Sequence, residues 1–169
     1  AEEHKLSLDD DIRIWLPEVR DYGQRITIRN LLNHTSGIRD YESLMPVAGM
    51  RYDMPYKPCE IFDFIIRQTA LDFSPGEKYA YSNSGYILLA EIVKRASGLS
   101  LGRFAGERIF QPLGMKNTFY YETLYQVVKN RSTGYDFDFN RLIYTTGQSD
   151  TYTIGPAGVF TSVEDLALW

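Results

Sequence analysis

The sequence is poor in cysteine and histidine and has no long apolar run. Cys59 is its single cysteine, so no disulfide can form within the chain. The two histidines, His4 and His34, are far apart and have no cysteine or acidic residue at metal-ligand spacing. We therefore expect no metal and no cofactor. No apolar stretch approaches the roughly 20 residues that span a bilayer, so the sequence predicts no membrane segment.

Positive charge is also scarce. The 18 lysines and arginines are outnumbered by 22 acidic residues, which gives a net charge of -4 without a basic cluster. This pattern does not predict a nucleic-acid partner. The 169 residues, of which 44% are apolar, are enough for one globular domain with a buried core. Aromatic residues make up 14% and include 13 tyrosines, whose rings suit clefts and half-exposed surfaces. This content alone would also allow a carbohydrate-binding module.

The spacing of the apolar residues predicts a mainly helical fold. The clearest helix lies in SNSGYILLAEIVKRASG, where Leu88, Leu89 and Ile92 recur at helical spacing and Gly98 follows as a stop. Shorter helices are predicted in LSLDDDIRIWLPEV, in ITIRNLLNHTSG with Thr27 as the N-cap, in KPCEIFDFIIRQTAL with Pro58 in the first turn, and in SLGRFAGERIFQPLGM from Ser100.

Other segments predict less regular structure. Residues 38–57 carry methionines and prolines without a period and are expected to form a long irregular loop. Alternating aromatic and polar residues around Asp138-Phe139-Asn140 predict a small β-hairpin. TSVEDLALW opens a helix that Thr161 or Ser162 can cap, and Leu166 to Trp169 begin a face that we expect to be buried. Because the sequence stops there, we expect it to be a piece of a longer protein.

Two motifs resemble functional patterns, but the residues around them exclude those functions. Gly98-Leu99-Ser100-Leu101-Gly102 matches G-x-S-x-G, but a nucleophile elbow needs a strand before the serine, and here a helix precedes it. The acidic run that starts at Asp136 imitates a calcium loop, yet Arg141 and Gly147 stand where that loop needs glycine and glutamate.

Tyr81-Ser82-Asn83 allows two interpretations. Ser82 or Asn83 can cap the following helix while Tyr81 packs. Alternatively, Tyr81 can act in acid–base chemistry, which requires nearby cations that lower its pKa from about 10. His34 is similarly open, because it either satisfies backbone groups at a helix end or borders a site.

Four consecutive blocks decide between these interpretations. ITIRNLLNHTSGIRDY, FSPGEKYAYSNSGYILLAEIVKRASG, IFQPLGMKNTFY and GPAGVFTSVEDLALW resemble, in order, blocks of the serine β-lactamase and penicillin-binding-protein-like family. That family includes class C β-lactamases, D-alanyl-D-alanine carboxypeptidases and esterases. The resemblance implies a helical domain inserted into an α/β sheet domain, with the site between them. Here it implies the helical insertion domain over residues 1–169, mainly α with a small β-hairpin, cut at both ends, without the sheet domain.

The resemblance also assigns residues. In the family an S-x-x-K serine attacks a carbonyl, and its lysine and a Y-x-N tyrosine move the proton. The match implies that Tyr81 is this tyrosine and that Asn83 is the asparagine that bonds the lysine and the substrate amide, whereas Ser82 has no role. No serine here has lysine three residues later, and no K-T-G strand motif is present.

We therefore expect the chain to be catalytically inert by itself, as part of a serine hydrolase acting on a small-molecule or peptide substrate: a β-lactam, a D-amino-acid peptide or an ester. The alternative is a non-catalytic binding or sensor module on the same fold. Location stays open, although the resemblance favours the periplasm or the cell exterior.

Overall fold

The computed structural model describes residues 3–52, 54–123, 126–138, 141–144 and 154–169. This part of the chain is mainly helical, as predicted, with two small antiparallel sheets. In chain order its elements are η1 (Ile12–Ile14), α1 (Ile28–Leu32), α2 (Tyr41–Leu44), α3 (Pro58–Ile66), α4 (Asn83–Ser97), α5 (Leu101–Ala105), η2 (Gly106–Phe110), β1 (Phe119–Tyr120), β2 (Tyr135–Asp138), β3 (Arg141–Tyr144), β4 (Val159–Phe160) and α6 (Val163–Leu166). None of the helices described is long and apolar enough to cross a membrane.

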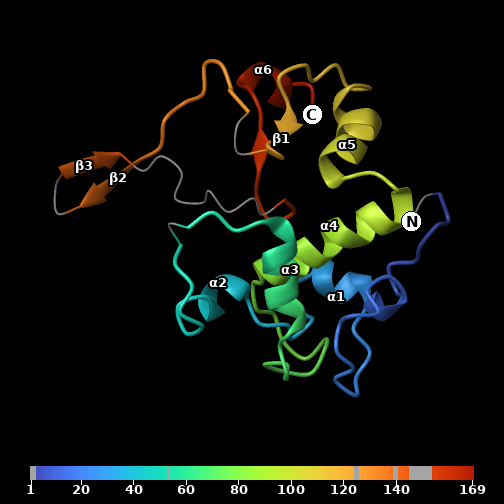
Figure 1. Cartoon of the computed structure of the whole chain (residues 1–169). Coiled ribbons are helices and arrows are strands. Elements are labelled where there is room, and N and C mark those ends of the chain that lie inside the picture. Colours follow the sequence, from blue (N-terminus) through green and yellow to red (C-terminus); the bar gives the residue numbers. More distant parts are fainter. Residues whose placement is uncertain (1–2, 53, 124–125, 139–140, 145–153) are drawn as a thin grey trace.

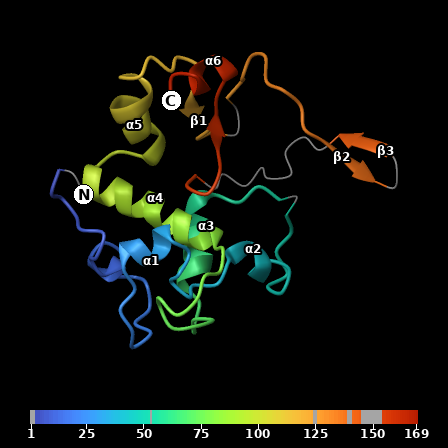
Figure 2. The same cartoon turned by 180° about the vertical axis from the view of Figure 1, so that it is seen from behind.

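Helix α4 runs through the centre of the molecule. Helices α1, α2 and α3 lie on one side of it, and α5, β1, β4 and α6 lie on the other (Figure 1). The predicted hairpin is present, because β2 pairs antiparallel with β3. It projects away from the helices, as the reverse view also shows (Figure 2).

The central helix is specified by its ends and its apolar face. Gly98 ends it in the left-handed conformation at φ 76°, as the sequence predicted. Leu88 and Ile92 are buried in the main core. Gly85 lies against the backbone of Leu31, where a Cβ atom would be 3.4 Å from the carbonyl oxygen. The glycine therefore lets α4 approach α1 closely. The other buried apolar residues of this core are Ile12, Leu16, Val19, Ile26, Ile28, Leu31, Ile38, Tyr41, Met45, Ile61, Ile65 and Ile87.

The expected irregular loop over residues 38–57 was partly wrong, because it contains α2. Asp40 caps this helix by accepting a hydrogen bond from the Ser43 backbone N–H. Tyr41 and Met45 are both buried in the main core. The short helix forms because its cap and its two buried side chains fix it locally, even though four residues are too few to show a period.

The last helix also differs from expectation. Ser162 caps α6, as predicted, but Leu166, Leu168 and Trp169 are 57%, 50% and 72% exposed. Asp165 is buried instead, and its carboxylate accepts hydrogen bonds from the Asn117 backbone N–H at 2.6 Å and the Thr118 hydroxyl at 2.7 Å. A polar contact, rather than an apolar face, therefore attaches α6 to the segment before β1.

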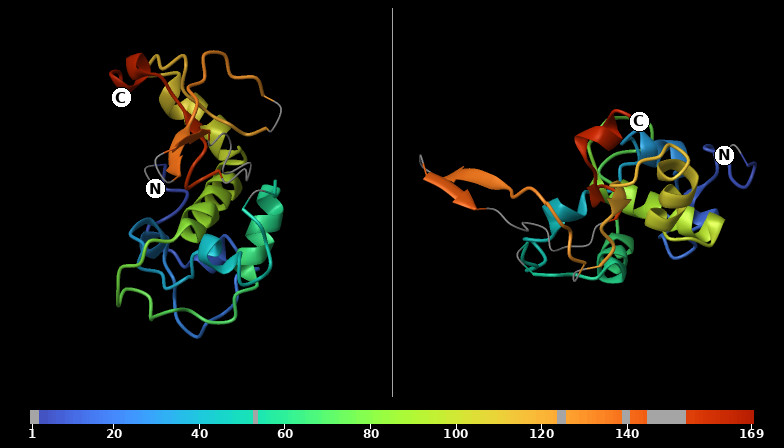
Figure 3. Two further views of the ribbon diagram at one scale, coloured as in Figure 1. Left: turned by 90° about the vertical axis from the view of Figure 1, so that its left-hand side faces the viewer. Right: turned by 90° about the horizontal axis from the view of Figure 1, so that it is seen from above.

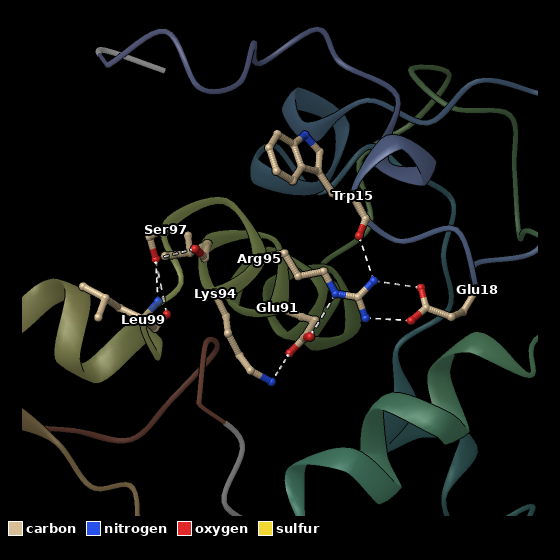
Figure 4. A network of polar contacts seen from close by, with 8 residues as sticks. Trp15, Glu18, Glu91, Lys94, Arg95, Ser97 and Leu99 are labelled. Carbon is tan, nitrogen blue, oxygen red and sulfur yellow. Dashed lines mark hydrogen bonds and ion pairs between the residues drawn. The ribbon is translucent and has the colours of Figure 1, made fainter.

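A polar network attaches the C-terminal turns of α4 to the segment after η1 (Figure 4). The Arg95 guanidinium donates to both carboxylate oxygens of Glu18, to the Trp15 carbonyl and to Glu91. The hydrogen bonds from Arg95 lower the pKa of the Glu18 carboxyl, and the contact with Glu18 raises the pKa of Arg95. Because these groups are partly exposed, the network stabilises the fold only modestly.

Candidate functional site

The turn after α1 is hydrogen-bonded to the segment that carries Tyr81. Thr27 and Asn30 form a capping box at the start of α1, and the Asn30 amide donates to the Thr35 hydroxyl. His34 and Gly37 both have left-handed backbones, with φ of 55° and 74°. Two such residues so close together turn the chain sharply, so that backbone groups of residues 34–37 face the segment that follows α3.

The segment that leads into α4 is bonded to this turn. Pro75 and Gly76 form a turn, with Gly76 at φ 87° and a hydrogen bond from the Glu77 N–H to the Ser74 carbonyl. The Gly76 N–H donates to the Thr35 carbonyl at 2.8 Å, and the Ala80 N–H donates to the His34 carbonyl at 2.9 Å. The chain therefore reaches Tyr81 in a fixed direction.

The start of α4 is capped by a residue distant in sequence. Ser82 occupies the N-cap position, but its side chain makes no capping hydrogen bond. Instead, Asp40 accepts from the Asn83 backbone N–H at 2.7 Å. The buried Ser84 hydroxyl donates to the Arg39 carbonyl and accepts from the Tyr41 N–H, both at 2.8 Å. The side-chain cap predicted at Ser82 or Asn83 is therefore absent, and Asp40 supplies the acceptor.

Tyr81 and Asn83 are brought together at this helix start. The Tyr81 hydroxyl donates to Asn83 Oδ1 at 3.1 Å, and the tyrosine is 58% exposed. A phenol that donates one hydrogen bond keeps acceptor lone pairs, and an amide that accepts through its oxygen keeps two N–H donors. The pair can therefore both accept hydrogen bonds from a neighbouring group and donate hydrogen bonds to it.

Three tyrosines surround His34. Its ring lies 4.6 Å from that of Tyr81, 5.1 Å from that of Tyr86 and 5.8 Å from that of Tyr79, measured between centroids. His34 Nδ1 also accepts from the Ser82 N–H at 3.1 Å. The His34 side chain thus borders the candidate site, and the backbone group that it satisfies belongs to the start of α4 rather than to the helix end nearby in sequence.

The two rejected motifs occupy other positions. Ser100 caps α5 by accepting from the Arg103 N–H, and Gly98 ends α4, so no strand precedes this serine. The acidic run lies in the β2–β3 hairpin, of which residues 139–140 are outside the described chain. The hairpin projects away from the helices in the view from above (Figure 3, right).

Sequence reasoning missed Asp40 and did not decide His34. Both reach the YSN segment across more than 40 residues, with separations of 43 for Asp40 to Asn83 and 48 for His34 to Ser82. The available signals were local: an aspartate before a short apolar run, and a histidine in a turn ending in glycine. Neither signal identifies its distant partner.

Comparison with known proteins places this geometry among known folds. The Beta-lactamase family model matches residues 1–169. The D-aminopeptidase of Brucella anthropi is 30% identical over 163 residues, which cover 96% of this chain and 30% of that protein. The octameric penicillin-binding protein homologue from Pyrococcus abyssi superposes with a TM-score of 0.80 at 30% identity, over 99% of this chain and 39% of that one. A D-stereospecific amidohydrolase from Streptomyces sp. gives 0.76 at 25% identity, over 99% and 53%. The chain therefore spans about a third to a half of these relatives.

Proposed function

Because this chain belongs to the beta-lactamase family, we propose that it forms the helical side of an acyl-transfer site in a larger serine hydrolase. The resemblance that the four sequence blocks indicated is confirmed by the family match. In this proposal residues 1–169 are the helical domain, and Tyr81 and Asn83 are its catalytic residues. The S-x-x-K serine and lysine and the K-T-G strand, which this sequence lacks, come from outside residues 1–169.

The observation that carries the proposal is the placement of the Tyr81 hydroxyl. It belongs to a residue that is 58% exposed just before α4, and it donates to Asn83 Oδ1. A lysine ammonium beside it would favour the phenolate form. The phenolate then takes the proton from the attacking serine hydroxyl and returns it to the leaving amine as the acyl-enzyme forms. The Asn83 N–H groups donate to the carbonyl oxygen of the substrate amide, or the Asn83 oxygen accepts from the lysine.

The proposed substrates are amides or peptides of D-amino acids. Two relatives of this chain are a D-aminopeptidase and a D-stereospecific amidohydrolase. A β-lactam ring and an ester present the same carbonyl chemistry, so substrates of these kinds belong in the same assay.

The first test uses the chain alone. We expect purified residues 1–169 to hydrolyse nitrocefin, a p-nitrophenyl ester and a D-amino acid p-nitroanilide no faster than buffer, because Tyr81 has no nucleophile to activate. The larger protein should hydrolyse at least one of the three. Turnover by the chain alone contradicts the proposal. Binding of substrate by the larger protein without turnover would instead favour the non-catalytic module.

A further inference from the structure

His34 is bonded to the chain on both sides of Tyr81. Its carbonyl accepts from the Ala80 N–H at 2.9 Å, and its Nδ1 atom accepts from the Ser82 N–H at 3.1 Å. The residue before Tyr81 and the residue after it are therefore held by the same histidine. Nδ1 can accept this hydrogen bond because an unprotonated imidazole nitrogen is an acceptor.

The histidine ring also contacts the phenol itself. It lies 4.6 Å from the Tyr81 ring at an interplanar angle of 33°, and it stacks with Tyr86 at 5.1 Å and 25°. Tyr86 is anchored by its hydroxyl, which donates to the Leu32 carbonyl at 3.2 Å. Tyr86, on α4 and bonded to the end of α1, thus supports the His34 ring, and the His34 ring supports Tyr81.

The backbone of His34 makes this double contact possible. Its φ of 55° is left-handed, a conformation that non-glycine residues adopt at a cost and that histidine and asparagine tolerate better than most. In this conformation the His34 carbonyl accepts from Ala80 while the ring accepts from Ser82.

Tyr81 needs such support because burial does not hold it. The side chain is 58% exposed, and its described hydroxyl partner is Asn83, two residues away. An exposed side chain otherwise samples several rotamers, whereas proton transfer requires the phenol oxygen within a fraction of an ångström of its partner.

We propose that His34 is the positioning residue of Tyr81, which it holds in one rotamer by contacting the phenol ring and hydrogen-bonding the backbone on both sides. The structural part concerns the chain itself, and the catalytic consequence rests on the proposed function.

The structural part is tested on the chain with His34→Asn. Asparagine accepts the positive φ and can accept from Ser82, but it has no ring. With ring-labelled tyrosine, the Tyr81 signal is assigned by its loss in Tyr81→Phe. We expect three-bond couplings to change from one fixed χ1 rotamer to an average, while the Ser82 amide stays protected and the urea midpoint is retained. If His34→Asn does not fold, His34→Gly takes its place. A fixed Tyr81 rotamer in the folded variant overturns the proposal.

Tyr79→Leu is the matched control. It removes a ring that meets His34 edge-on at 5.8 Å and is itself 68% exposed. In this variant His34 keeps its ring contact with Tyr81 and both of its backbone hydrogen bonds. We therefore expect the Tyr81 rotamer to stay fixed. An equal loss of order in both variants would mean that the order of Tyr81 depends on the whole ring cluster, which also overturns the specific role of His34.

The catalytic consequence is tested in the larger protein. We expect His34→Asn to lower kcat by about 10- to 100-fold and to change KM by less than about threefold. Combined with Tyr81→Phe it should cost little more than Tyr81→Phe alone. An unchanged kcat in His34→Asn beside a large loss in Tyr81→Phe overturns the positioning role. If Tyr81→Phe itself keeps full kcat, the proposed function fails, and the coupling measurement on the chain still decides whether His34 fixes the ring.

Discussion

Replacing Tyr81 with phenylalanine in the larger enzyme is expected to lower kcat/KM by about 10²- to 10⁴-fold without unfolding it. The change removes the hydroxyl that donates to Asn83 Oδ1 at 3.1 Å and keeps the ring that contacts His34. Because Tyr81 is more than half exposed, its hydroxyl contributes little to stability. Steady-state hydrolysis of a D-amino acid p-nitroanilide measures the first effect, and urea unfolding of residues 1–169 measures the second.

Ser82→Ala is the control for this prediction. The Ser82 hydroxyl is buried and, within the part of the chain that the structure describes, has no hydrogen-bond partner. Its removal therefore breaks no described hydrogen bond, and we expect kcat/KM within about twofold and stability within about 1 kcal/mol of the parent. A loss of activity in Ser82→Ala as large as that in Tyr81→Phe would show that the assay reports the shape of the helix start rather than the phenol.

Replacing Gly37 with alanine is expected to destabilise the chain by about 3 kcal/mol or more. Gly37 has φ 74°, and a Cβ atom there would overlap the backbone carbonyl of Phe73. The Gly37 carbonyl also accepts from the Asp72 N–H at 2.9 Å, so the two segments cannot separate without breaking this bond. The left-handed backbone alone costs about 1–2 kcal/mol for a residue with a Cβ atom, and the overlap adds the rest. Urea unfolding at neutral pH measures the change.

Gly76→Ala separates the two causes. Gly76 has a similar φ of 87°, but a Cβ atom there would meet nothing within 4 Å. We expect it to lose only the conformational part, about 1–2 kcal/mol. Equal losses at Gly37 and Gly76 would mean that the contact with Phe73 does not matter and that the turn carrying His34 is not pinned to this segment.

Local patterns predicted most of the helices, although LSLDDDIRIWLPEV forms only the three-residue 3-10 helix η1. The extent of α4 follows from its apolar stripe and from Gly98, and Thr27, Pro58, Ser100 and Ser162 mark helix starts where they were expected. Alternation predicted the β2–β3 hairpin. These features depend on residues within one or two turns of each other, so periodicity and caps are enough to identify them.

Long-range contacts were not predictable in the same way. The cap of α4 comes from Asp40, and α2 forms inside a segment that shows no period. The apolar residues that end α6 are exposed because Asp165 provides the buried contact. For both Asp40 and Asp165 the partner lies more than 40 residues away, where one sequence gives no pairing information. The blocks around Tyr81 did identify the family, but the catalytic roles of Tyr81 and Asn83 remain predictions.

The proposal that the nucleophilic serine lies outside residues 1–169 is tested most directly by locating the acyl-enzyme nucleophile. Residues 1–169 and the larger protein are each incubated with a fluorophosphonate, and adducts are counted by intact mass and mapped after proteolysis. We predict no adduct on the chain alone and one adduct on the larger protein. This adduct should lie at a serine outside residues 1–169 that is followed three residues later by lysine. A stoichiometric adduct on a serine within residues 1–169 would contradict it.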